Sequence, residues 1–313
     1  MIFMAANWIP KRLVDISLIN VAAKTGAYFV EVCETEYKNR ISAAVRAILK
    51  SQRHIVMLTG PSSSGKTTTA YRLCEELGRC GSTAQVISLD DFFLDMKDYP
   101  LLPDGTPDYE NVTALDIPLI NRCLAEVAET GKTMVPQYDF LTQQRMAAYR
   151  SVEIGDGVLI IEGIHAHNPM LVELLPQDKV YKVYAGLREE YSYMGKRVLP
   201  TRDVRLARRM VRDCKFRGHS PLKTLEMWPG VCHGEDLYIK VFKPHADYIL
   251  DTSFSYEIEC LAPQVLELAE KFCDGTEKTK KLEQLAQWFR LCEEPMSQYV
   301  PQDSMLMEFL AKP

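Results

Sequence analysis

The sequence has no long apolar run and no excess of positive charge, and these two absences exclude several kinds of protein. No stretch of its 313 residues approaches the eighteen or more apolar residues that a membrane-spanning helix needs. The apolar N-terminal segment lacks a preceding basic region and is interrupted at Pro10, unlike a secretory signal. The formal net charge of −5 gives no general attraction for phosphate backbones or acidic membranes. We therefore expect a soluble, cytoplasmic protein that binds neither nucleic acid nor membranes.

Paired cysteines are also missing. The nine cysteines form an odd set without any C-x-x-C motif, and the adjacent Cys232 and His233 do not have metal-ligand spacing. Scattered single cysteines are typical of thiols that are kept reduced in a cytosol.

The most informative segment is residues 60–67, which read G-P-S-S-S-G-K-T and match the phosphate-binding pattern G-x-x-x-x-G-K-[ST]. A β-branched, apolar run at 54–59 predicts a strand before it, and residues 67–77 predict a helix after it. This order directs successive backbone N–H groups at one point, where they can bind phosphate oxygens. We expect Lys66 to reach the β- and γ-phosphates of ATP and the Thr67 hydroxyl to ligate Mg²⁺. The residues expected to form the ATP cradle are Gly60, Ser62, Ser63, Ser64, Gly65, Lys66, Thr67 and Thr68.

Strands and helices alternate along the rest of the chain. Apolar runs predict strands at 84–89, 157–163, 179–184 and 246–251, with shorter strands at 133–140 and 152–154. Helical periodicity predicts helices at 34–50, 116–128, 202–217, 261–272, 282–291 and 305–310, and 16–32 can be read as a helix and turn broken at Gly26. This alternation predicts an α/β protein with a P-loop NTPase fold, in which helices cover both faces of a doubly wound, mostly parallel sheet.

Carboxylates follow two of the predicted strands. Ligands of open α/β sheets bind beyond the carboxyl ends of the strands, where Asp90 and Glu162 stand. Asp90 could accept the proton of an attacking hydroxyl, and Glu162 could hold Mg²⁺ directly or through water. The alternative interpretations are a helix N-cap for Asp90 and a salt-bridged strand end for Glu162.

Arginines are concentrated in the predicted helix at 202–217. Arg202, Arg205, Arg209 and Arg212 share one helical face, with Arg208 and Arg217 close by. A solvated, salt-bridged face is one interpretation, which Asp203 and Asp213 support. We favour an arginine-rich lid around 188–218 that closes over the triphosphate, because guanidinium groups suit phosphate.

Five motifs in order resemble the uridine kinase/phosphoribulokinase family. They are residues 60–67, S-L-D-D-F-F at 88–93, P-Q-Y-D-F at 136–140, I-E-G-I at 161–164, and R-L-A-R-R-M-V-R-D at 205–213 with Arg217 and Gly218. The resemblance extends over about 55–272 and is strongest to bacterial uridine kinase-type nucleoside kinases. It implies three parts: an N-terminal extension with a packing helix (1–53), a P-loop kinase domain (54–273) and a C-terminal helical closure (274–313).

The same resemblance implies roles for individual residues. Asp90 would be the base for a nucleoside 5′-hydroxyl, assisted by Lys66 and Arg205. Glu110, after Tyr109, would hold the ribose hydroxyls together with Arg205. Tyr138 and Phe140 would contact the base, while Arg208 and Arg217 would contact the phosphates.

The departures from the family pattern concern the acceptor. Gln143 stands where uridine kinases carry a histidine that reads the pyrimidine, and Arg145 follows it on the substrate side. Glu110 replaces an aspartate, and Ile164-His165 replaces the usual Ile-Leu. We interpret His165 as a residue that packs in the core or supports the residues of the site, in preference to a direct ligand.

The sequence therefore predicts an ATP- and Mg²⁺-dependent kinase of a small hydroxyl compound, most simply a nucleoside whose base specificity is relaxed or altered. A kinase of another polyol or sugar is the alternative within enzymes. A regulatory ATP-binding switch or an inactive paralogue is the alternative of another class. The sequence leaves four points open: the acceptor, the choice between ATP and GTP, the role of the N-terminal extension, and whether the protein forms a homo-oligomer.

Overall fold

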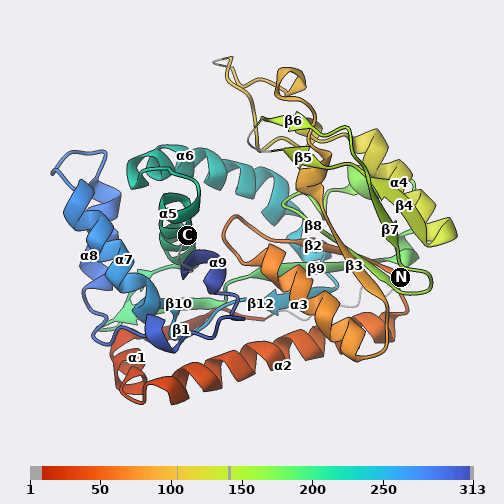
Figure 1. Cartoon of the computed structure of the whole chain (residues 1–313). Helices are drawn as coiled ribbons and strands as arrows, with labels where there is room; N and C mark the ends of the chain where they lie inside the picture. The colour runs from red at the N-terminus through yellow and green to blue at the C-terminus, as the bar shows by residue number, and fades with distance from the viewer. Residues whose placement is uncertain (1–8, 104, 140–141, 311–313) are drawn as a thin grey trace.

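The computed structural model describes residues 9–103, 105–139 and 142–310, and its centre is a five-stranded parallel sheet (Figure 1). The strand order is β12-β9-β2-β8-β3. The strands are β2 (Ile55–Thr59), β3 (Ala84–Ser88), β8 (Val158–Glu162), β9 (Val180–Gly186) and β12 (Tyr248–Asp251). All five were predicted, within about two residues at each end. The loop at 60–67 leaves from β2, the middle strand.

Helices cover both faces of this sheet, as the doubly wound fold requires. Val56 and Leu58 of β2 belong to the larger of two main cores, and Ile55 and Met57 to the other, because successive strand residues point to opposite faces. The helices of the larger core are α1 (Ile16–Ala23), α2 (Ala27–Ser51), α3 (Lys66–Arg79), α5 (Thr201–Phe216), α6 (Pro221–Gly234), α7 (Glu257–Phe272), α8 (Lys280–Phe289) and α9 (Met307–Leu310). On the opposite face lies α4 (Ile117–Thr130). The α/β fold class is confirmed.

A second sheet was not predicted. Strand β1 (Arg12–Asp15) pairs in parallel with β10 (Glu189–Tyr193), which pairs antiparallel with β11 (Lys196–Leu199). Arg12 joins this sheet to the central one, since its guanidinium lies 2.9 Å from Glu189 and 2.8 Å from Asp251 at the end of β12. The first third of the segment expected to be a lid is therefore sheet, and α5 and the unpredicted α6 follow it.

Two short pairs of strands extend from the other edge of the central sheet, the edge formed by β3. They are β4 (Lys132–Val135) with β7 (Arg150–Glu153), and β5 (Tyr138–Asp139) with β6 (Gln144–Arg145). The strand predicted at 133–140 is thus interrupted at Pro136 and Gln137, because proline cannot continue a ladder of hydrogen bonds. Figure 1 shows β5 and β6 projecting from the body of the molecule.

The N-terminal segment is a layer of the same core. Gly26, at φ +59°, makes the predicted break between α1 and α2. One side of α2, carrying Tyr37, Ile41 and Ile48, is buried, and the helix runs along the sheet beside α3 (Figure 1). The domain boundaries remain a prediction, but residues 27–51 pack as tightly as the helices that follow the phosphate loop.

The structure also bears on the cysteines and on membrane-spanning helices. All nine cysteines are free thiols, and Cys33, Cys123 and Cys260 are buried. Within the described residues no single helix is long and apolar enough to cross a membrane; α1 and α2 together have the length and composition, but they are bent by 115°.

We expect Ile48→Ala to lower the free energy of unfolding of the whole protein by about 2–5 kcal/mol, because Ile48 is fully buried in the larger core. Leu49→Ala, on the neighbouring position of α2 but 38% exposed, is the matched control and should cost less. Chemical denaturation followed by circular dichroism measures both. An unchanged main transition in Ile48→Ala would show that residues 1–53 fold apart from the rest.

Candidate active site

The loop between β2 and α3 has the geometry of an anion cradle. Ser63 and Gly65 have positive φ angles of 58° and 78°, which turn successive N–H groups toward one side. Gly60 must be glycine, since a Cβ there would collide with the carbonyl oxygen of Ala185 on β9. Within the described structure the Ser63 and Ser64 hydroxyls are buried without a hydrogen-bond partner. A loop with unused buried hydroxyls and a helix beginning at Lys66 suits phosphate.

Arginines of α5 donate hydrogen bonds to oxygen atoms of the phosphate loop. Arg205 donates to the carbonyl oxygen of Ser62 (2.9 Å), Arg208 to that of Ser63 (3.4 Å), and Arg209 to the Ser62 hydroxyl (2.7 Å). Each guanidinium also meets a buried carboxylate: Glu235 at 2.6 Å, Glu257 at 2.5 Å and Asp213 at 3.3 Å, respectively. Arg205, Arg208 and Arg209 are therefore buried and hold the phosphate loop, whereas Arg202 is partly exposed and forms no hydrogen bond with it in the described structure.

Arg208 and Arg217, both expected to contact phosphates, lie in different surroundings. Arg208 is completely buried, donates to the Thr252 carbonyl as well as to Glu257, and stacks over the Phe309 ring at 5.1 Å. Three of its five N–H donors are engaged by protein groups, so Arg208 supports the loop in this structure, and its expected contact with phosphate stays a prediction. The Arg217 side chain is half exposed; partial burial and repulsion from Arg212 lower its pKa, and Asp213 and Asp90 oppose this shift.

Glu162, at the end of β8, faces the phosphate loop. One carboxylate oxygen accepts hydrogen bonds from Ser88 (2.8 Å) and Thr67 (3.2 Å). The other is buried without a hydrogen-bond partner in the described part of the chain. Burial raises the pKa of Glu162, Lys66 opposes this shift, and Asp90 reinforces it. A cation bound beside Thr67 would therefore stabilise the ionised form of Glu162.

These two residues fit Mg²⁺ that is bound mainly by phosphates. No group of three or more His, Cys, Asp or Glu side chains with metal-binding geometry occurs among residues 9–103, 105–139 and 142–310. Mg²⁺ in phosphoryl-transfer sites commonly takes only one or two protein ligands, and phosphate and water oxygens supply the rest. Thr67 and Glu162 can provide that number.

Asp90 and Asp91 are distinguished by their surroundings. Ser88, not Asp90, caps the short helix η1 (Leu89–Phe92), because its hydroxyl accepts from the Asp90 N–H. The Asp90 carboxylate is exposed. Burial raises the pKa of the Asp91 carboxyl, while Arg150 and the Tyr138 N–H oppose the shift. Asp91 is thus tied into the fold, whereas Asp90 is accessible.

Glu110 approaches the same space from another loop. Burial raises its pKa to about 7; Arg209 and Lys66 oppose this, and Asp108 and Asp90 reinforce it. The end of α6 packs against Glu110, since a Cβ on Gly234 would lie 2.8 Å from the Glu110 Cβ. The structure therefore brings Glu110, Lys66 and Asp90 together, from three separate segments.

Four aromatic side chains form a cluster, and the charge of Asp90 acts on one of them, Tyr99. Phe93 lies 5.7 Å from both Tyr99 and Tyr138, measured between ring centroids, and Tyr109 lies 5.6 Å from Tyr99. Tyr138 is buried, whereas Tyr109 is half exposed. The remaining aromatic candidate, Phe140, lies outside the described residues.

The other substrate-side candidates are placed differently. Gln143 is exposed, at φ +55° in the turn between β5 and β6. Arg145 donates to Asp116 (2.9 Å) and to the carbonyl oxygens of Phe92 and Phe93 (3.4 and 3.3 Å). Arg145 therefore holds the segment that follows Asp90 and Asp91, and its expected role on the substrate side stays a prediction. Burial lowers the pKa of His165 to about 4, and its ring packs edge-on against Tyr238, as expected for a packing residue.

The C-terminal segment reaches the phosphate loop, which no sequence pattern indicated. Thr68 donates to Glu308 at 2.8 Å, and a Cβ on Gly65 would collide with the sulfur of Met305. Met305 and Phe309 are buried. Residues 305–309 thus border the loop where α3 begins. Glu235 and Glu257, the partners of the arginines, were likewise not found from the sequence, because they lie 30 and 49 residues away along the chain.

Comparisons with known proteins agree with this geometry. Residues 55–258 match the model of the phosphoribulokinase/uridine kinase family. The chain is 27% identical to the uridine kinase of Deinococcus deserti over 197 residues, which is 63% of this chain and 86% of that protein. It is 26% identical to the uridine kinase of Clostridium tetani over 202 residues, 64% of this chain and 88% of that protein. A solved kinase from Silicibacter sp. TM1040, assigned to a fructose transport system, superposes with a TM-score of 0.50 at 20% identity, covering 67% of this chain and 98% of that one.

A parallel sheet with this loop after its central strand, and carboxylates at the ends of two neighbouring strands, defines a P-loop kinase. The chain belongs to the phosphoribulokinase/uridine kinase family, as its motifs predicted. Membership supports a phosphotransferase that uses ATP. The identities of 26–27% leave the acceptor to be argued from the site.

We expect Glu308→Gln to bind a non-hydrolysable ATP analogue several-fold more tightly, because it removes a negative charge 2.8 Å from a hydroxyl of the cradle and keeps a hydrogen-bond acceptor. Glu270→Gln, an exposed position on α7, is the matched control for net charge and should have no effect. Isothermal titration calorimetry measures both dissociation constants. Equal affinities in Glu308→Gln and the parent would show that the Glu308 side chain turns away when nucleotide binds.

Proposed function

We propose that the protein transfers the γ-phosphoryl group of ATP, as its Mg²⁺ complex, to the 5′-hydroxyl of a nucleoside. The observation that carries the proposal is the exposed Asp90 directly after β3, next to the end of β8, where Glu162 accepts a hydrogen bond from Thr67 of the phosphate loop. The charges of Lys66 and Asp90 also act on Glu110. Phosphoryl transfer needs a bound triphosphate, an oriented hydroxyl and cations around the developing charge, and this cluster can provide each of them. A regulatory nucleotide switch would not need the accessible Asp90 or the carboxylate of Glu110.

The proposed roles follow from the chemistry of each side chain. The Asp90 carboxylate accepts the proton of the 5′-hydroxyl as that oxygen attacks the γ-phosphorus, and the bond to the β-phosphate oxygen breaks to release ADP. Lys66 and Arg217 neutralise the negative charge of the transferred group, and Arg205 keeps the loop carbonyls turned away from it. Mg²⁺ bound at Thr67 and Glu162 would add charge neutralisation at the phosphates.

The acceptor is inferred from two features. An ionised Glu110 offers two oxygens, which can accept hydrogen bonds from both vicinal hydroxyls of a ribose. The group formed by Phe93, Tyr99, Tyr109 and Tyr138 offers aromatic faces to a planar base, which a sugar or open-chain polyol would not require. Gln143, in place of a histidine, supports a relaxed or altered choice of base. A polyol kinase remains the alternative that an acceptor screen distinguishes.

We expect Asp90→Asn to lower kcat by about 10²–10⁴ while the affinity for an ATP analogue changes only a few-fold, because the amide cannot accept the proton. Asp91→Asn is the matched control, since Asp91 is held by the fold; it should keep most of its turnover and lose stability. Coupled ADP-release kinetics and thermal unfolding separate the two effects. An active Asp90→Asn enzyme beside an inactive Asp91→Asn enzyme would reverse the assignment.

The KM for the nucleoside should fall about tenfold as the pH rises from 6 to 8, because the pKa of Glu110 is raised to about 7 and only its ionised form accepts from both ribose hydroxyls. Glu110→Gln should have a higher KM that does not vary over this range. Initial rates at fixed ATP concentration test both. The same pH dependence in Glu110→Gln would assign the titration to another group.

A further inference from the structure

A cavity that Asp90 does not line lies next to the phosphate loop. It has a volume of about 580 Å³, and Pro61 of the loop forms part of its wall, whereas Asp90, Glu110 and Tyr138 do not line it. The other walls come from the segment before β1, the end of β9, the hairpin of β10 and β11, the start of α5, and the turns η6 (Glu235–Ile239) and η7 (Lys240–His245). We refer to it as the basic pocket. Its size suits a small metabolite.

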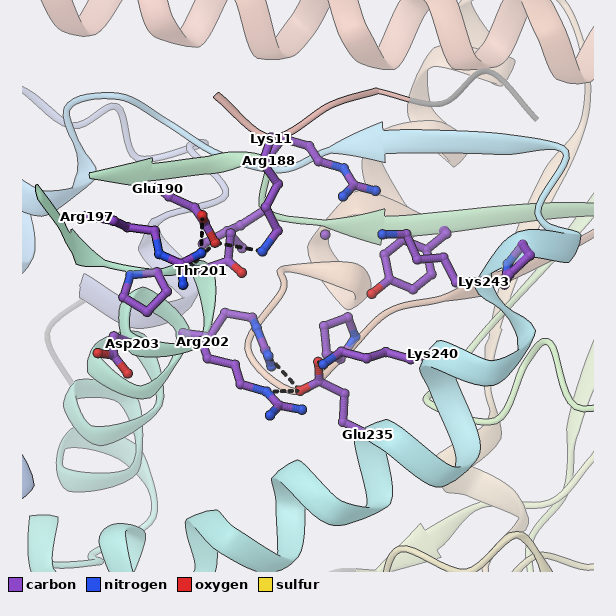
Figure 2. A pocket seen from close by; sticks show the side chains of 17 residues that line it. Lys11, Arg188, Glu190, Arg197, Thr201, Arg202, Asp203, Glu235, Lys240 and Lys243 are labelled. Atoms are coloured by element: carbon purple, nitrogen blue, oxygen red, sulfur yellow. Dashed lines mark hydrogen bonds and ion pairs between the residues drawn. The ribbon is translucent and has the colours of Figure 1, made fainter. Parts of the chain in front are cut away.

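Basic side chains dominate the lining of this pocket (Figure 2). Seven are cationic, namely Lys11, Arg188, Arg197, Arg202, Arg205, Lys240 and Lys243. Three are acidic, namely Glu190, Asp203 and Glu235. Such an excess of positive charge is unusual in a chain whose formal net charge is −5. It indicates that the pocket attracts anions.

The carboxylates of the pocket are already engaged. Glu190 pairs with Lys11 at 2.6 Å and with Arg197 at 3.0 Å. Glu235 pairs with Arg205 at 2.6 Å, and Lys240 and Arg202 lie 3.2 and 3.6 Å away from it. Asp203 pairs with Lys281, which does not line the pocket. Asp236, outside the lining, also pairs with Arg202 at 2.7 Å and with Lys240 at 2.9 Å. Three carboxylates therefore serve five cations, and the seven cations of the lining outnumber its three acidic residues.

Two of the cations lie over the ring of Tyr184. The Arg188 guanidinium carbon is 6.0 Å from the centre of this ring, and the Lys243 ammonium is 5.0 Å from it. Arg188 is only 2% exposed. The pKa of Lys243 is lowered to about 8, first by burial and then by repulsion from Arg188, Lys11 and Lys240. An anion between these side chains would relieve that repulsion.

We propose that the basic pocket binds the phosphate group of a small phosphorylated metabolite, as a site separate from the ATP cradle. Guanidinium groups bind phosphate in a bidentate manner, and lysines add point charges, so Arg188, Lys243 and Lys240 form a suitable set. The apolar side chains of Leu187, Pro200 and Pro244 provide walls for the uncharged part of the ligand. The proposal does not depend on which hydroxyl compound the enzyme phosphorylates.

The pocket is physically connected to the active site through Arg205. One Arg205 nitrogen donates to Glu235 in the pocket, and another donates to the Ser62 carbonyl of the phosphate loop. An anion that draws Lys240 and Arg202 away from Glu235 leaves Arg205 as its main partner. Occupancy of the pocket therefore changes the support of the loop, and binding at the two sites is coupled.

The test uses inorganic phosphate as the probe, followed by ³¹P NMR at constant ionic strength, with the full chain in the Lys66→Ala background to weaken the cradle. We expect saturable binding in this background, at least tenfold weaker binding after Arg188→Gln together with Lys243→Gln, and at least threefold weaker binding after Lys243→Gln alone. The single variant guards against unfolding when the buried Arg188 is replaced. Lys196→Gln, an exposed neighbour on β11 outside the pocket, is the charge-matched control and should bind as its parent does.

Two results would overturn the proposal. One is the absence of saturable binding in the Lys66→Ala background, which would place the phosphate in the ATP cradle alone. The other is equal weakening by Lys196→Gln and Lys243→Gln, which would reduce the effect to net charge. Neither result bears on phosphoryl transfer itself, which is measured by product formation.

Discussion

The phosphate loop depends on buried guanidinium groups that bind its carbonyl oxygens. A loop that turns its N–H groups toward an anion must turn some carbonyl groups away, and buried carbonyls need donors. Arg205 and Arg208 supply them to Ser62 and Ser63, and Glu235 and Glu257 compensate the two charges. Buried ion pairs tolerate little rearrangement, since removal of one partner leaves an unpaired charge. Through them the positions of α5, α6 and α7 become part of the active-site geometry.

Local sequence was sufficient for the elements whose chemistry lies within a short segment. The loop at 60–67, the strand before it and the helix after it could be predicted because glycines, a lysine and an apolar run define them without distant partners. Asp90 and Glu162 could be placed together because parallel strands end at the same edge of a sheet. The surroundings of Asp91 could not be predicted, since Arg150 and the Tyr138 N–H, which stabilise its ionised form, lie on the hairpins beyond α4.

The remaining features are made by residues far apart in the chain. Strand β10 begins with Glu189 and Glu190, an unusual start for a buried strand, and its pairing with β1 is accompanied by ion pairs to Arg12 and Lys11 that span more than 170 residues. Similarly, Thr68 donates a hydrogen bond to Glu308, which lies 240 residues further along the chain. The amphipathic pattern of the arginine helix could not reveal Glu235 and Glu257, the carboxylates that pair with its buried arginines. Whether the helix also moves when ATP and acceptor bind stays a prediction.

The central claim is phosphoryl transfer from ATP to a nucleoside 5′-hydroxyl, and the most direct test is the identity of the product. The protein is incubated with ATP, Mg²⁺ and, separately, each of a panel of ribonucleosides, their 2′-deoxy forms and polyols, and the products are identified by ³¹P NMR and mass spectrometry. The account predicts a 5′-monophosphate from at least one ribonucleoside, with little product from its deoxy form. Phosphorylation of polyols alone, or release of inorganic phosphate without any phosphorylated acceptor, would contradict it.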